Sequence, residues 1–207
     1  MCTATPRWLD RDIPLKAAPG VVWAPSNIKS HPAGMAPRGA VILCHGYLGS
    51  RFDLVDMAEA LASAGFLVAA PEFAESLSSP DTTPAFARPG APVPVNPSAS
   101  RNTIVSAVLS DIVSGRFGID CGDGDGVGGG GGGSSKVAIV GQSAGAATAT
   151  STPGRFARVA IAGFRPPAQD PAALRALLRD PLLVIASEGD GVISLYPTDA
   201  GRFGGGS

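Results

Sequence analysis

The stretch KVAIVGQSAGAATA, Lys136–Ala149, decides how this sequence is interpreted. Its first half is a short apolar run typical of a buried strand, and its second half is rich in alanine, which favours a helix. Between them lies GQSAG, Gly141–Gly145, with the pattern G-x-S-x-G. A serine on a sharp strand-to-helix turn is held exposed, with helix N–H groups behind it. The context predicts a nucleophile at Ser143; the alternative is a plain tight turn.

Other apolar runs on both sides of this stretch have the length and composition of strands that are covered on both faces. The expected strands are Ala40–His45, Phe66–Ala70, Lys136–Val140, Leu182–Ala186 and, more weakly, Arg158–Ala162. The expected helices are Asp53–Ala64, Asn102–Ser114, a short helix from Ser143, and Pro171–Leu178. This alternation predicts an α/β fold: a mostly parallel, doubly wound sheet with right-handed crossovers and helices on both faces.

Two of these helices have apolar residues at helical spacing, which predicts the faces that they bury. The residues are Leu54, Met57, Ala58 and Leu61 in the first, and Ile104, Ala107, Val108 and Ile112 in the second. Ser50 or Asp53 is expected to cap the start of the first helix, and Gly65 to end it.

The rest of the chain divides into one core and less regular segments. We expect residues 1–39 to be an N-terminal extension with an edge strand at Val21–Ala24, and residues 40–194 to be the core. Within the core, residues 76–98 are expected to be an irregular loop, and residues 121–135, with the glycine run Gly128–Gly133, a flexible insertion. Residues 195–207 are expected to be a disordered tail.

Composition excludes several classes of function. The 207 residues suffice for one domain, and a net charge of −1 without a basic run argues against a nucleic-acid partner. No stretch is apolar enough to span a bilayer, and residues 1–12 lack the apolar region of a secretory signal. The three cysteines are far apart in the sequence and lack the spacing of metal ligands, which fits free thiols in a reducing compartment. We therefore expect a cytoplasmic protein.

No metal or organic cofactor is expected. The glycine run is not followed by the Gly-Lys-Ser/Thr of a phosphate loop. Asp120, Asp123 and Asp125 resemble a calcium loop but lack its spacing and its closing glutamate.

His45-Gly46-Tyr47 follows the first strong strand, at the end that faces the ligand crevice in a parallel sheet. Gly46 allows a sharp turn, so the N–H of Tyr47 can point at a substrate oxygen. Together with the N–H of Ala144 it would form an oxyanion hole with two donors. The alternative is a simple strand terminus.

A carboxylate is expected after the strand in LLVIASEGDGVI, Leu182–Ile193. An acid at such a strand end can orient a histidine and stabilise its charged form. Asp190 is the first choice, Glu188 the second, and Asp170, after the weaker strand, the third. The alternative is an ordinary polar loop.

Together these segments resemble the α/β-hydrolase superfamily, and within it esterases similar to dienelactone hydrolase, polyester hydrolases, platelet-activating-factor acetylhydrolases and chlorophyllases. The resemblance runs from about Ala40 to Ser194, on VILCHGYLGS (Val41–Ser50), LASAGFLVAAPEF (Leu61–Phe73), VAIVGQSAGAA (Val137–Ala147) and PLLVIASEGDGVI (Pro181–Ile193). It implies Ser143 as nucleophile, Asp190 as triad acid and the N–H groups of Tyr47 and Ala144 as oxyanion donors, with the ring of Tyr47 lining an acyl pocket.

The family's histidine follows the acid, whereas both histidines of this sequence, His31 and His45, precede Ser143. We therefore expect a C-terminally incomplete hydrolase fold. The expected function is a serine carboxylic-ester hydrolase, acting on a small-molecule or lipid ester through an acyl-enzyme, with impaired or no activity in this chain. The alternatives are a non-catalytic hydrolase-like binding protein and a truncated gene product. The oligomeric state and the ester are left open.

Overall fold

The computed structural model describes residues 7–9, 20–24, 37–73, 75, 97–113, 136–164 and 171–187. The strands are β1 Arg7–Leu9, β2 Gly20–Ala24, β3 Ala40–Cys44, β4 Leu67–Pro71, β5 Val137–Gln142, β6 Ala157–Ile161 and β7 Leu182–Ile185. The helices are α1 Val55–Ser63, α2 Pro97–Val113, α3 Ala144–Ser151 and α4 Pro171–Leu177. The predicted glycine-rich insertion and C-terminal tail lie outside the described residues.

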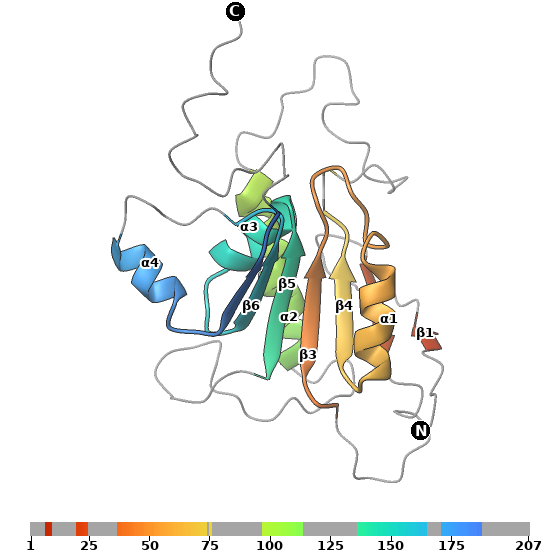
Figure 1. The fold of residues 1–207 in the computed structure, drawn as a ribbon. Coiled ribbons are helices and arrows are strands. Elements are labelled where there is room, and N and C mark those ends of the chain that lie inside the picture. The colour runs from red at the N-terminus through yellow and green to blue at the C-terminus, as the bar shows by residue number, and fades with distance from the viewer. Residues whose placement is uncertain are drawn as a thin grey trace, which may run out of the picture.

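The strands form one seven-stranded sheet in the order β1-β2-β4-β3-β5-β6-β7. The five strands from β4 to β7 in this order are mutually parallel, whereas β2 is antiparallel to β4 and β1 is antiparallel to β2. The predicted α/β class and mostly parallel sheet are confirmed. Because the parallel strands end together, β3, β5, β6 and β7 share one carboxyl edge, which is the upper edge in Figure 1.

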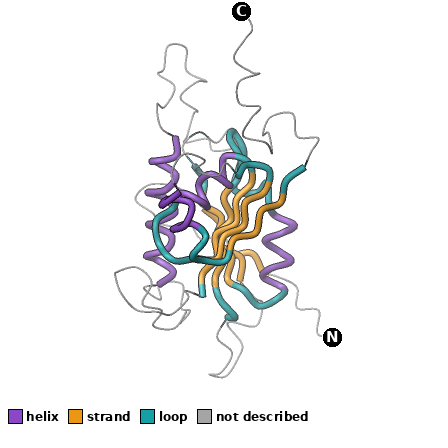
Figure 2. The backbone as a smooth tube through the Cα atoms, turned by 60° about the vertical axis from the view of Figure 1, so that its left-hand side comes forward, coloured by secondary structure: helices purple, strands orange, loops and turns teal. Residues whose placement is uncertain are grey.

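Helices cover the sheet on both faces, as predicted (Figure 2). The prediction that the last strand is also covered on both faces was wrong: β7 is the outermost strand, and its residues Leu183, Val184 and Ile185 are exposed. On one face α1 places Ala58 and Ala62 against alternate residues of β2, β3 and β4. On the other face α2 packs Ile104, Val105 and Val108 against the residues in between, and α3 joins the same cluster. Every residue of β3 and β4 is buried, because successive side chains enter opposite cores.

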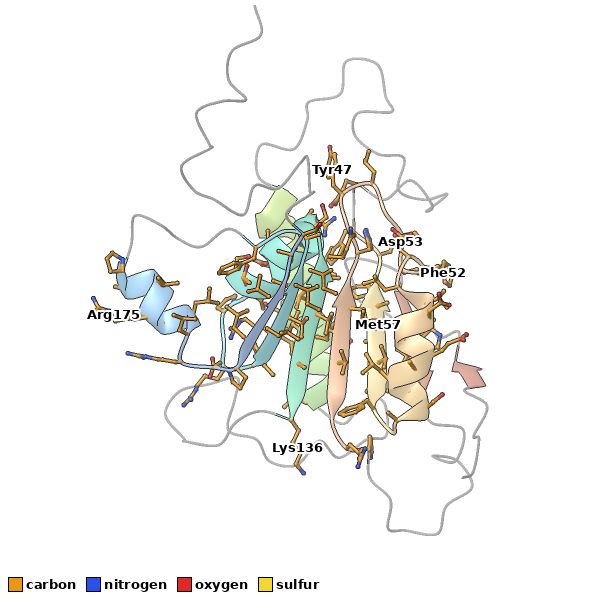
Figure 3. The ribbon with its side chains drawn as sticks, viewed as in Figure 1. Tyr47, Phe52, Asp53, Met57, Lys136 and Arg175 are labelled. Atoms are coloured by element: carbon orange, nitrogen blue, oxygen red, sulfur yellow. The ribbon has the colours of Figure 1, made fainter. Side chains whose placement is uncertain are left out.

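The candidate site lies at the carboxyl edge of the sheet, far from the opposite edge. Tyr47 lies just beyond the end of β3 at the carboxyl edge, and Lys136 lies before the start of β5 at the other edge (Figure 3). In a parallel sheet the carboxyl edge is where ligands bind. The carboxyl edge is therefore where a ligand site is expected.

Several expectations about individual elements were wrong. The expected edge strand at Val21–Ala24 is β2, which begins at Gly20 and lies inside the sheet, because β1 pairs with its outer side. Helix α2 begins at Pro97 rather than Asn102, so the irregular loop ends earlier than predicted. Ala107 is only half-buried, because the inward face of α2 is completed by Val105 and Leu109.

The start of α1 also differs from the prediction. Its N-cap position is Leu54, which makes no side-chain capping hydrogen bond. The hydroxyl of Ser50 instead donates to the carboxylate of Asp53, 2.9 Å away, in the turn that precedes the helix. The predicted stop is confirmed, since Gly65 follows the helix with φ of 95°.

Candidate active site

Ser143 occupies a sharp bend between β5 and α3. Its backbone has φ of 55° and ψ of −118°, a region that residues with a side chain rarely adopt. Its N–H donates to the carbonyl of Ile161, 2.8 Å away, and its own carbonyl accepts from the N–H of Ala146 at 2.9 Å. These bonds to β6 and to the first turn of α3 hold the serine in its strained conformation.

The two glycines of the pentapeptide are required by close backbone approach. A Cβ on Gly141 would lie 1.9 Å from the carbonyl oxygen of Gly145. A Cβ on Gly145 would lie 2.0 Å from the carbonyl oxygen of Cys44, at the end of β3. Neither obstacle is a flexible side chain, so the first turn of α3 can lie against β5 only when Gly141 lacks a Cβ, and against β3 only when Gly145 does.

Backbone strain gathers at the carboxyl edge of the sheet. Among the described residues, three other than glycine have positive φ: Leu48 at 63°, Ser143 at 55° and Ala162 at 49°. They follow β3, β5 and β6, which are neighbours in the sheet. Strained backbone persists where the surroundings over-determine it, and it is concentrated at active sites.

The loop after β3 lies directly beside the serine. A Cβ built on Gly46 would lie 3.5 Å from the Cβ of Ser143 and 2.7 Å from Oε1 of Gln142. The next residue, Tyr47, is 47% exposed at the carboxyl edge (Figure 3). Ala144 begins α3, where the first backbone N–H groups have no partner within the helix. The residues predicted as nucleophile and oxyanion donors thus lie together.

His45 is buried beneath this loop, with an exposed fraction of 2%. Nδ1 lies 2.8 Å from the carbonyl oxygen of Gly46, and Nε2 accepts from the N–H of Phe73 at 3.3 Å. A carbonyl oxygen can only accept, so Nδ1 carries a proton and donates to it. Oε1 of Glu72 lies 3.3 Å from Nε2. Both ring nitrogens therefore have partners in the loops after β3 and β4, which fits a structural role for His45.

Arg101, near the start of α2, is 2% exposed and reaches the same loop from the other side. Its guanidinium donates to the carbonyl oxygens of His45 at 2.8 Å and Gly46 at 3.0 Å. It also forms an ion pair with Glu75 and lies 4.2 Å from the ring centroid of Phe73. The buried charge is thus neutralised and its donors are directed at backbone carbonyls.

The sequence interpretation missed this support beneath the loop. The available signal was the position of Arg101, which lies three and four residues before Ile104 and Val105 on the buried face of α2. A charged residue on an apolar helix face indicates a buried ion with a partner. Gly163 was also missed: a Cβ there would lie 2.2 Å from the carbonyl oxygen of Ser143, and no sequence pattern signalled that approach.

Asp190, Glu188, Asp170 and His31 lie outside the described residues. Strand β7, which precedes the first two of these carboxylates, is parallel to β6 and ends at the same carboxyl edge as β5.

The described residues include no group of three or more His, Cys, Asp or Glu side chains that could hold a metal ion. Cys44, at the end of β3, is a fully buried free thiol, and burial raises its pKa to about 12. In the part of the chain that the structure describes, no helix combines the length and apolar character needed to cross a membrane.

Comparison with known proteins supports the architecture. The chain is similar to the crystal structure of TT1662 from Thermus thermophilus, with a TM-score of 0.58 and 18% sequence identity, over 92% of this chain and 78% of that one. No protein-family model matches the sequence, and no curated protein does. Identity this low shows the fold alone. Together with the sheet order and the layers, it gives this chain an α/β-hydrolase-like fold.

Proposed function

We propose that this chain is a serine hydrolase of carboxylic esters. Oγ of Ser143 bonds to the ester carbonyl carbon, the bond from that carbon to the alcohol oxygen breaks, and the alcohol leaves with a proton. Water then attacks the acyl-enzyme, and the acid departs while Ser143 regains its hydroxyl. The N–H groups of Tyr47 and Ala144 stabilise the oxyanion of each tetrahedral intermediate.

The single observation that carries the proposal is the strained backbone of Ser143 beside the Gly46 loop. The turn requires Gly141, Gly145 and Gly163 at close backbone approaches. A serine with φ of 55° on this turn lowers the stability of the fold by about 1–3 kcal/mol. The cost is explained when the turn has a chemical use, which is to present the hydroxyl beside backbone donors. The exposed ring of Tyr47 at the same edge is suited to contact an apolar acyl chain.

A general base must accept the hydroxyl proton of Ser143, and the presence of such a base determines the expected rate of acylation. Of the two histidines in the sequence, His45 has both ring nitrogens engaged, and His31 lies outside the described residues. Asp190 remains the proposed acid that would orient a base. Without a positioned base the hydroxyl is a weak nucleophile at neutral pH, so we expect slow acylation.

The test is hydrolysis of p-nitrophenyl esters of increasing acyl length. We expect a slow release of p-nitrophenol that depends on the acyl chain and is lost in Ser143→Ala. The matched control is Ser151→Ala, which removes a hydroxyl from the opposite end of α3, where it contacts Asn102. Equal release by the wild type and Ser143→Ala would refute the proposal.

The engaged ring of His45 favours a second candidate, a non-catalytic binding protein that retains a hydrolase-like site. This candidate predicts binding of an ester or its carboxylate product at the carboxyl edge with no turnover. A non-hydrolysable ketone analogue that carries ¹³C at its carbonyl separates the two. A nucleophilic serine adds its Oγ to the carbonyl carbon and its proton to the carbonyl oxygen, and NMR detects the tetrahedral carbon, whereas a protein that only binds the ketone leaves the carbonyl intact.

A further inference from the structure

One backbone carbonyl beside Ser143 has three donors. The oxygen of Gly46 lies 2.8 Å from Nδ1 of His45, accepts from the guanidinium of Arg101 at 3.0 Å, and accepts from the N–H of Gly49 at 3.2 Å. A carbonyl oxygen has two lone pairs, so three converging donors leave it little freedom to turn.

The direction of this carbonyl determines the direction of a proposed oxyanion donor. The carbonyl of Gly46 and the N–H of Tyr47 belong to one planar peptide unit, and no described peptide bond is cis. In a trans peptide the C=O and the N–H point to opposite sides. When the oxygen is held toward His45 and Arg101, the N–H of Tyr47 faces the other way.

Of the two side-chain donors, Arg101 is the one supplied by a distant part of the chain. It enters from α2, and Glu75 and the ring of Phe73 hold its guanidinium in place. One planar guanidinium bonds two consecutive carbonyls, those of His45 and Gly46. A lysine has a single ammonium on a flexible chain and cannot reproduce this fork.

We propose that Arg101 is a positioning residue that orients the Gly46–Tyr47 peptide, so that the N–H of Tyr47 faces the reaction centre above Ser143. The catalytic significance of this role rests on the proposed function, whereas the orientation itself does not. Loss of the fork lets the peptide turn, which removes one oxyanion donor without touching Ser143.

A second buried arginine provides a matched control. Arg158, at the start of β6, also donates to backbone carbonyls, among them those of Ala149 and Gly154, and also pairs with a carboxylate, Asp180. It lies 5.6 Å from the ring centroid of Phe156. Because it sits at the opposite edge of the sheet from Ser143, its substitution tests for general loss of stability.

The experiment compares Arg101→Lys with Arg158→Lys at temperatures equally far below their melting points. A third variant, Arg101→Met with Glu75→Gln, removes both charges of the pair, so that no unpaired ion stays buried. The first readout is the rate at which a fluorophosphonate probe labels Ser143. The second is the N–H residual dipolar coupling of Tyr47 in ¹⁵N-labelled protein, which reports the orientation of the peptide.

We expect labelling to slow in both Arg101 variants, by up to the roughly 100- to 1,000-fold of losing one oxyanion donor, with a changed Tyr47 coupling. Arg158→Lys should keep the wild-type rate and coupling. Equal slowing in Arg158→Lys, or an unchanged Tyr47 coupling in both Arg101 variants, overturns the proposal. If the wild-type Ser143 is not labelled at all, the proposed function fails, and the Tyr47 coupling alone decides the role of Arg101.

Discussion

Replacing Gly145 by alanine tests the packing that brings α3 against the end of β3. The new Cβ would lie 2.0 Å from the carbonyl oxygen and 2.6 Å from the carbonyl carbon of Cys44, and 2.8 Å from the carbonyl oxygen of His45. Ordinary contact begins near 3.4 Å. Because all three atoms are backbone, the helix or the strand end must move.

The sign of the effect distinguishes this packing from simple helix propensity. Overpacking of a core costs about 1–3 kcal/mol, and rigid backbone obstacles favour the upper end. Glycine to alanine within a helix contributes about 1 kcal/mol in the opposite direction. We therefore expect Gly145→Ala to lower the free energy of unfolding by about 2 kcal/mol and the melting temperature by about 4–8 °C.

Urea denaturation followed by circular dichroism measures this change. The control is Ala147→Gly on the exposed face of the same helix, which should cost about 1 kcal/mol from propensity alone. If Gly145→Ala were as stable as the wild type or more stable, α3 would not lie against Cys44, and the geometry given for the serine turn would be wrong.

Three further predictions concern the same region. Ser143→Gly should be more stable than Ser143→Ala by about 1 kcal/mol in urea denaturation. Glycine adopts positive φ without the strain of about 1–3 kcal/mol, although it loses more chain entropy on folding. Equal stabilities of the two variants would argue against strain at this position. The pKa of Cys44 is raised from 9.0 to about 12 by burial, so above pH 9 the unfolded state releases a proton that the folded state retains. The free energy of unfolding of the wild type should therefore fall between pH 9 and 12 by up to about 1.4 kcal/mol per pH unit more than that of Cys44→Ala, and parallel curves would contradict the burial. Imidazole added to the p-nitrophenyl ester assay should accelerate release by the wild type beyond its effect on Ser143→Ala, since it can accept the serine proton; the same increment in both proteins would mean that Ser143 is not acylated.

The five parallel strands could be predicted because each is an apolar run that can be recognised in the sequence by itself. β3 and β4 are uniformly apolar, as strands buried on both faces must be, and helical patterns separate them. The antiparallel side could not be predicted in the same way. β1 has three residues, too few for a pattern, and β2 becomes an interior strand only through its pairing with β1.

The parts of the candidate site that lie within short sequence motifs could be predicted. Ser143 and Ala144 are adjacent in sequence, and the Gly46–Tyr47 turn follows a recognisable strand. The ion pair between Arg101 and Glu75 spans 26 positions along the chain and creates no local pattern. Buried charges of this kind depend on a partner that only the folded chain brings near.

The most direct test of the central claim is to incubate the protein with a fluorophosphonate probe and map the adduct by peptide mass spectrometry. If the hydroxyl at the β5–α3 bend is the nucleophile, its oxygen displaces fluoride, and the label appears on Ser143 and disappears in Ser143→Ala. A label on another residue, or labelling that survives in Ser143→Ala, would contradict the claim.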